Sequence, residues 1–132
     1  MNSSEGAEDL EQRFNKAHKE FRITLKSIIH TLQQDGFSME NCWEICDQLD
    51  LLDSFLGDME ELGPEMALVK PYRAIFHDLP RCYFLDYQFQ FDCLSIQTGL
   101  DDVRGLLADC FHDDCAQVAC LGLEGLLARL PF

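Results

Sequence analysis

One apolar stripe near the start of the chain constrains the fold more than any other feature of the sequence. Its residues recur at steps of three and four, the spacing of one face of an α-helix. They are Leu10, Phe14, Ala17, Phe21, Leu25, Ile28 and Leu32. A helix of about seven turns must bury such a face against other elements, so the stripe predicts a helical domain.

The next segment repeats this pattern after a short break. Gly36 predicts the end of the first helix, because glycine is favoured just past a helix end. Ser38 is expected to cap a second helix, in which Cys42, Ile45, Cys46, Leu49, Leu52, Leu56 and Met59 again have helical spacing. The connection is short, so the two helices should be antiparallel. Gly63 and Pro64 predict a break, followed by short helical pieces at 64–69 and 71–77.

An aromatic segment at 83–93 follows a different pattern. Its odd-numbered positions, from Tyr83 to Cys93, are apolar with a period of two, which favours a β-strand with one buried face. A strand needs a partner, and no other segment alternates as well. Three interpretations stay open: the strand pairs with a short irregular segment, it pairs with another chain, or the segment is an aromatic-rich helix.

The last third predicts two more helices, at 103–111 and 116–130, after Gly99 opens the region. Ala116, Ala119 and Gly122 would allow close helix–helix approach. With 132 residues, of which 47% are apolar, the chain suits one domain. We therefore expect a mainly α, single compact domain of five or six helices with one extended aromatic segment, covering 8–132 behind a flexible acidic tail at 1–7.

The net charge of −14 narrows the choice of partner. Residues 37–62 hold eight acids and no base. Such acidity excludes nucleic-acid binding and anionic membranes as main targets, and it favours a basic protein partner. The first helix carries a basic stripe of Arg13, Lys16, Lys19, Arg22 and Lys26. We expect part of this stripe to pair with acids of the second helix, which leaves surplus acid for a partner.

Seven cysteines bear on the cellular compartment: Cys42, Cys46, Cys82, Cys93, Cys110, Cys115 and Cys120. Their odd number and the absence of Cys-x-x-Cys spacing predict free thiols rather than a disulfide framework. No membrane segment or secretory signal is evident, so we expect an intracellular location, cytoplasmic or nuclear. Cys110, His112 and Cys115 could form a metal or thiol site, although no fourth ligand is obvious.

Motifs for catalysis are missing from the sequence. There is no glycine-rich phosphate loop, no G-x-S-x-G and no local Cys/His signature. We therefore expect no catalytic, cofactor or metal residues, and a non-enzymatic interaction module: an adaptor, a regulatory subunit or a chaperone-like binder that forms homo- or hetero-oligomers. The alternative is a small metal-dependent or thiol enzyme using Cys110, His112 and Cys115. The candidate partner-binding residues are Trp43, Asp47, Asp50, Asp53, Tyr87, Phe89 and Phe91.

Overall fold

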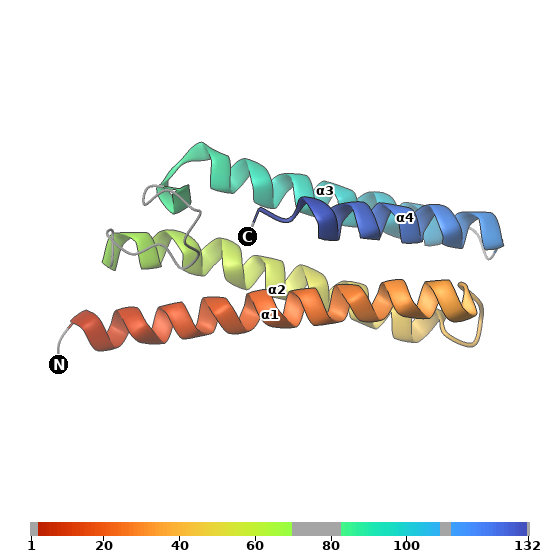
Figure 1. The fold of residues 1–132 in the computed structure, drawn as a ribbon, viewed down its shortest axis with the longest axis horizontal. Coiled ribbons are helices and arrows are strands. Elements are labelled where there is room, and N and C mark those ends of the chain that lie inside the picture. The colour runs from red at the N-terminus through yellow and green to blue at the C-terminus, as the bar shows by residue number, and fades with distance from the viewer. Residues whose placement is uncertain (1–2, 70–82, 109–111, 132) are drawn as a thin grey trace.

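The computed structural model describes residues 3–69, 83–108 and 112–131, which form an antiparallel four-helix bundle (Figure 1). The helices are α1 (Ser3–Asp35), α2 (Cys42–Val69), α3 (Tyr87–Ala108) and α4 (Asp113–Arg129). A short 3-10 helix, η1 (Tyr83–Leu85), precedes α3. Each helix packs against the next, and α4 closes the ring against α1. The predicted helical class is confirmed.

The apolar stripe of α1 forms one wall of the core, as predicted. Phe14, Phe21 and Leu25 are fully buried, and each such side chain contributes about 1.5–3 kcal/mol through burial. The helix begins at Ser3, so it takes in most of the segment that was expected to be a flexible tail. It ends at Asp35, and the next residue, Gly36, has a φ of +67°, in the left-handed region that glycine adopts without strain.

The turn between α1 and α2 is held by Asn41 rather than by the expected cap, Ser38. The Asn41 side-chain oxygen accepts from the Ser38 backbone N–H at 2.9 Å, and its amide donates to the Gly36 carbonyl at 2.7 Å. The helix therefore starts at Cys42, four residues after Ser38. Asn41 uses both ends of its amide to close the turn.

The predicted break at Gly63 and Pro64 is wrong, because α2 continues through both residues to Val69. Proline removes one backbone hydrogen bond from a helix, so packing has to offset this loss. Gly63 is buried at a point where a Cβ would lie 2.8 Å from Phe84 Cδ1 and 2.9 Å from Phe89 Cζ. The glycine therefore provides the space in which the aromatic rings dock on α2. The helical piece expected at 71–77 lies outside the described residues.

The expected β-strand at 83–93 is also wrong: Tyr83–Leu85 is a 3-10 turn and the rest of the segment is the start of α3. The aromatic-rich helix, the third interpretation, is confirmed. The alternation of apolar and polar residues stops at the end of this segment. Apolar residues at steps of three or four, by contrast, continue from it through the whole of α3. That longer stripe is Phe89, Cys93, Ile96, Leu100, Val103 and Leu107, all buried. A stripe of more than five turns buries much more surface than one unpaired strand.

Gly99 does not separate two helices either, because α3 runs through it. A Cβ at Gly99 would lie 2.7 Å from Leu126 Cδ2, so glycine permits close approach of α3 and α4. These continuous helices explain why the described residues contain four α-helices instead of the five or six that we predicted. Within the described ranges, none of the helices has the length and hydropathy required to cross a membrane.

Candidate interaction surface

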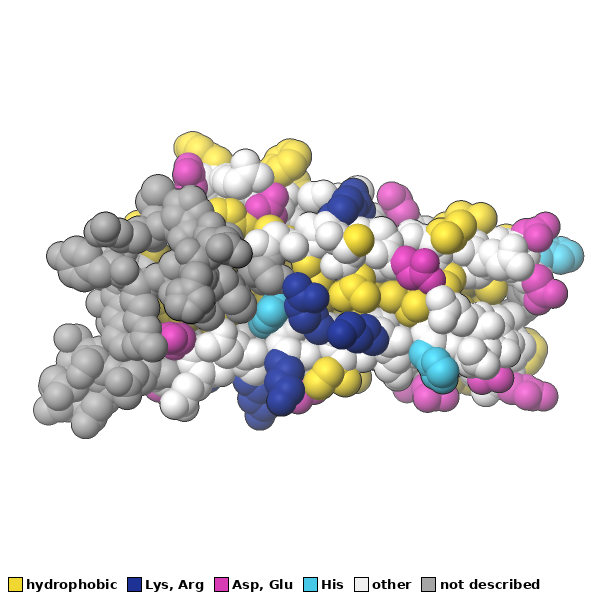
Figure 2. All heavy atoms as spheres, viewed as in Figure 1, with side chains coloured by type: hydrophobic (Ala, Val, Ile, Leu, Met, Phe, Trp, Pro, Cys, Tyr) yellow, Lys and Arg dark blue, Asp and Glu magenta, His cyan; other side chains and the backbone are white. Residues whose placement is uncertain are grey.

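A second apolar stripe runs along the outside of α3. Tyr87, Phe91 and Leu94 follow one another at helical spacing, and 86%, 64% and 64% of their respective surfaces are exposed. Single exposed apolar residues are common, but adjacent large ones are typical of interaction sites. In Figure 2, hydrophobic side chains project from the upper edge of the molecule, over the first half of α3. We call Tyr87, Phe91 and Leu94 the outer stripe.

The outer stripe lies in the most acidic part of the molecule. Helix α2 and residues 83–108 together contain twelve acidic residues and one basic residue, Arg104. Of the acids, Asp92 directly follows Phe91 in the same two turns of α3 as the outer stripe. Glu60 of α2 lies near Cys93, on the inner side of α3, where its charge and that of Asp92 add to burial in raising the pKa of the Cys93 thiol to about 12. Among the described residues of this half of the bundle, the charge that a partner of the outer stripe meets is therefore mainly negative.

The opposite half of the bundle has a balanced surface. Helices α1 and α4 together contain nine acids and six bases. On the face that Figure 2 shows, where α1 and α4 lie toward the viewer, Lys and Arg side chains gather near the middle and several acids lie toward one end. The net negative charge of the described residues is thus concentrated in α2 and residues 83–108, the half of the bundle that contains the outer stripe.

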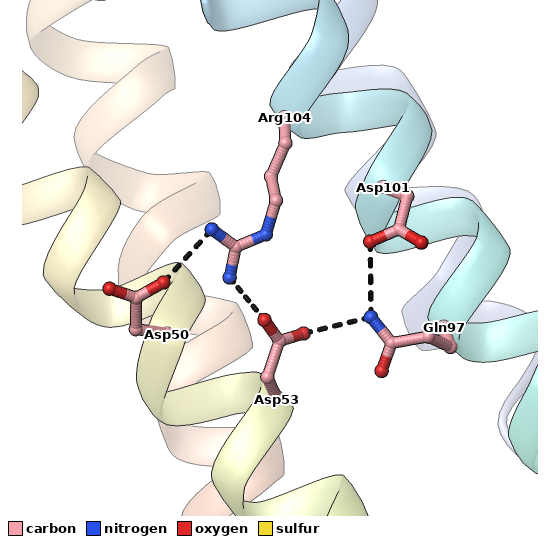
Figure 3. A network of polar contacts seen from close by, with 5 residues as sticks. All are labelled: Asp50, Asp53, Gln97, Asp101 and Arg104. Carbon is pink, nitrogen blue, oxygen red and sulfur yellow. Dashed lines mark hydrogen bonds and ion pairs between the residues drawn. The ribbon is translucent and has the colours of Figure 1, made fainter.

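A polar network joins α2 to α3 and engages Arg104 (Figure 3). Arg104 forms an ion pair with Asp50 at 2.9 Å and a second, closer one with Asp53. The Gln97 amide donates to Asp53 Oδ1 and to Asp101 Oδ1, each at 3.1 Å. Asp50 and Asp53 are therefore held by α3 rather than by the basic stripe of α1, with which we expected acids of α2 to pair.

Asp92 takes part in a second polar group at the start of α3. Its carboxylate accepts from the Tyr83 hydroxyl and, at 2.8 Å, from the Gln88 side-chain amide. Burial, followed by this bond to Asp92, raises the pKa of the Tyr83 hydroxyl. Tyr83 also contacts Phe84 and Phe89 edge to face, with ring centroids 5.5 Å and 5.6 Å apart. These contacts fix the first turn of α3, from which the outer stripe begins.

The predicted partner-binding residues fall into separate places. Trp43, with 79% of its surface exposed, and Asp47, also exposed, lie in the first two turns of α2. Tyr87 and Phe91 begin the antiparallel α3, so they lie near the other end of the bundle. The structure therefore brings Tyr87 and Phe91 together but leaves Trp43 apart from them. Phe89 is fully buried in the core, so it cannot offer its side chain to a partner.

Leu94 was missed as a candidate because the strand pattern assigned it to the opposite face from Tyr87 and Phe91. In a helix, residues 87, 91 and 94 share one face, since they are separated by four and three positions. A search of this segment at helical spacing would have found the outer stripe and placed Phe89 on the other side.

The cysteines give a mixed result. Cys42, Cys46, Cys93 and Cys120 are free thiols, as predicted. Cys115 is disulfide-bonded, so the expectation of free thiols is wrong at this position. The disulfide removes the Cys115 thiolate from the suggested site with His112 and Cys110, and Cys110 lies outside the described residues. Within the described ranges, no group of three or more metal-ligating side chains is found.

A shallow cleft of about 610 Å³ lies where the end of α1 meets the start of α4. Gln33 crosses from α1 and donates to Glu124 Oε1 at 2.6 Å. Nearby, Cys120 donates to the same carboxylate at 3.5 Å, and burial, followed by this bond, raises the pKa of its thiol to about 11. Neutral thiols of this kind are poor nucleophiles. None of the predicted site residues lines the cleft.

Comparison with known proteins identifies the family. A family model described as "Family of unknown function (DUF6217)" matches residues 1–132, and the chain therefore belongs to this family. No curated protein and no solved structure matches the chain.

Proposed function

We propose that this member of the DUF6217 family is a non-enzymatic interaction module: an adaptor, a regulatory subunit or a chaperone-like binder. It docks a protein partner through the outer stripe and the acidic surface of α2 and α3. The observation that carries this proposal is the exposure of Tyr87, Phe91 and Leu94 as neighbours on one helix face.

The energetics of burial support this use of the outer stripe. The core is complete without it, because α3 already buries Phe89, Cys93, Ile96, Leu100, Val103 and Leu107 on its inner side. Covering a large apolar side chain releases about 1.5–3 kcal/mol. Two aromatic anchors and a leucine are enough to form the centre of a binding site. Trp43, exposed farther along the same half of the bundle, is available as a second anchor for an extended partner.

The charge distribution favours a different chain as the partner over a second copy of this one. Two copies meeting through the outer stripe would place acidic surface against acidic surface, and like charges across an interface cost several kcal/mol. We therefore propose a hetero-oligomer. We also propose an intracellular location, which the free thiols support and the disulfide at Cys115 opposes.

The alternative enzyme based on Cys110, His112 and Cys115 receives no support from the described residues. A thiol nucleophile or metal ligand must be a thiolate, and Cys115 has no thiol while its disulfide is intact.

A capture experiment in cells tests the proposed function. Proteins bound to the tagged chain are identified by mass spectrometry, with the double variant Tyr87→Ser/Phe91→Ser compared with the wild type. Ile23→Ser is the matched control, because Ile23 is an exposed apolar residue on α1. We expect the double variant to lose specific partners that Ile23→Ser retains. An identical set of captured proteins for all three chains would contradict the proposal.

A further inference from the structure

We infer that the segment which binds the outer stripe is a basic amphipathic helix of another protein. This inference rests on the proposed function and specifies the chemistry of the partner. It follows from the spacing of the exposed apolar residues and from the charges that surround them.

The apolar part of the site has the dimensions of a helix contact. Tyr87 and Leu94, the ends of the outer stripe, are seven positions apart in α3, which is about 10 Å along the axis. A partner helix meets such a row with apolar residues at its own i, i+3 or i+4 and i+7 positions. The side chains of Tyr87, Phe91 and Leu94 are attached to a rigid helix. Binding of a partner therefore requires little additional ordering of this protein.

Acidic residues lie about two turns beyond the end of this row, on both sides of its line along α3. Asp101 is seven residues after Leu94, and its bond to Gln97 places it toward α2. Asp102 is exposed one residue later, about 100° farther around the helix and away from α2. Glu60 adds a further exposed carboxylate from α2, near Cys93. Lysines or arginines about two turns beyond the apolar residues of a partner helix would meet Asp101 and Asp102.

Within α2 and residues 83–108, no basic group is available to weaken this field. Arg104 is the one basic residue in α2 and 83–108, and it is held by Asp50 and Asp53. Nucleic acids and anionic lipid surfaces are repelled by such a face, and a second copy brings the same charge. A basic amphipathic helix is the occupant whose apolar face matches the outer stripe and whose positive charges match the acidic residues of this half of the bundle.

A designed peptide provides the probe. It is a synthetic helix of about 18 residues in leucine, lysine and alanine, long enough to be helical, with leucines at i, i+3, i+4 and i+7. Binding to the full chain is measured by calorimetry and located by backbone NMR shifts. We expect the shifts to centre on α3 and the facing side of α2. A peptide with glutamate in place of lysine, and one with the same composition in scrambled order, should each bind at least about tenfold more weakly.

Matched variants separate a local site from general attraction to an acidic protein. Phe91→Ser should weaken binding at least about tenfold, while Ile23→Ser should not. Two double variants change the net charge equally: Glu60→Lys/Asp102→Lys and Asp9→Lys/Asp114→Lys. All four residues are exposed. Because screening limits exposed charges to about 8 Å in physiological salt, only the first pair should cause a large loss. Equal losses for both pairs, or shifts centred on α1 and α4, would overturn the inference.

The outcomes also distinguish this inference from the proposed function. If cellular partners depend on Tyr87 and Phe91 but the basic peptide does not bind there, the interaction module stands and the basic helix is wrong. If the peptide binds the outer stripe but the set of proteins captured in cells does not change on substitution of Tyr87 and Phe91, the proposed function is wrong. Sedimentation of the chain alone adds a third test: a dimer that Phe91→Ser dissociates would identify a second copy as the occupant and overturn the inference.

Discussion

Helix α3 carries two apolar stripes that are alike in composition and opposite in surroundings. The inner stripe begins at Phe89 and Cys93 and is buried along its whole length, whereas the outer stripe exposes Tyr87, Phe91 and Leu94. Both contain a phenylalanine in the first two turns of the same helix. The inner stripe is explained by folding, because it fills the bundle. The outer stripe has no role in the core, and this difference is the reason to assign it to binding.

The largest expected difference between the stripes is in stability. Phe89→Ala should lower the free energy of unfolding by about 3–5 kcal/mol, because it leaves a cavity where the ring meets Tyr83 and Phe84. Phe91→Ala should change it by less than about 0.5 kcal/mol. Denaturant unfolding of both variants measures the contrast. A Phe91→Ala variant as unstable as Phe89→Ala would remove the basis for treating the outer stripe as a binding site.

A pair of glycines in α2 tests how closely the inner stripe is packed. Gly63→Ala should cost about 1–3 kcal/mol of stability, because the added Cβ meets Phe84 and Phe89 at 2.8 Å and 2.9 Å. Gly57→Ala is the matched control, since no atom lies within 4 Å of a Cβ at that position. It should stabilise the helix by up to about 1 kcal/mol. Thermal melts of both variants should shift in opposite directions, and a neutral Gly63→Ala would mean that the aromatic rings pack more loosely than described.

The bundle was largely predictable from sequence because its signal is long-range periodicity. The stripe of α1 and the turn at Gly36 were read correctly from spacing alone. The errors came from local signals that tertiary packing outweighs. Gly63 and Gly99 look like helix breakers, but each provides room for a side chain of another element, and the sequence does not reveal which element lies opposite.

The candidate site was predictable only in part, for a related reason. Tyr87 and Phe91 were predicted to bind a partner as members of a strand with an unpaired edge, whereas they are exposed on a helix. Phe89 was selected with them because a period of two places 87, 89 and 91 on one face, whereas a helix turns Phe89 inward. Trp43 was predicted to lie at the border of the apolar stripe, whereas 79% of its surface is exposed. Its separation from Tyr87 depends on the antiparallel arrangement of α2 and α3, which no local pattern encodes.

Alkaline pH should reveal the inner stripe through its one titratable member. Burial raises the pKa of Cys93 from 9.0 to about 12, so the folded state keeps the thiol protonated where the unfolded state ionises. The stabilisation is complete below pH 9 and is lost as the pH rises toward 12. Stability should therefore fall with pH in this window, with a slope of up to about 1.4 kcal/mol per pH unit from this group.

The control for this pH dependence comes from the same stripe. Cys93→Ala should reduce the slope, while Ile96→Val should lower stability at every pH and leave the slope unchanged, because it removes apolar atoms and no titrating group. Urea unfolding at intervals between pH 8 and 11 measures both. A slope of unchanged size in Cys93→Ala would assign it instead to Cys46, Tyr83 and Cys120, whose pKa values are also raised by burial.

The smallest expected effect concerns the polar network between the two stripes, on the side of α3 that faces α2. Arg104→Gln should cost about 1 kcal/mol or less, because the side chains of Arg104 and Asp53 are 30% and 35% exposed and their attraction is partly screened. Arg129→Gln removes the same charge from the exposed end of α4 and should cost less than about 0.5 kcal/mol. Adding salt should shrink the difference in stability between Arg104→Gln and the wild type.

Among the carboxylates, Asp53→Asn should be more costly than Asp50→Asn, because Asp50 is 70% exposed and Asp53 also accepts from Gln97. Equal losses for the two aspartates would indicate that Arg104 acts through general charge balance, and the network would then not hold α3 in the orientation that turns one stripe inward and the other toward a partner.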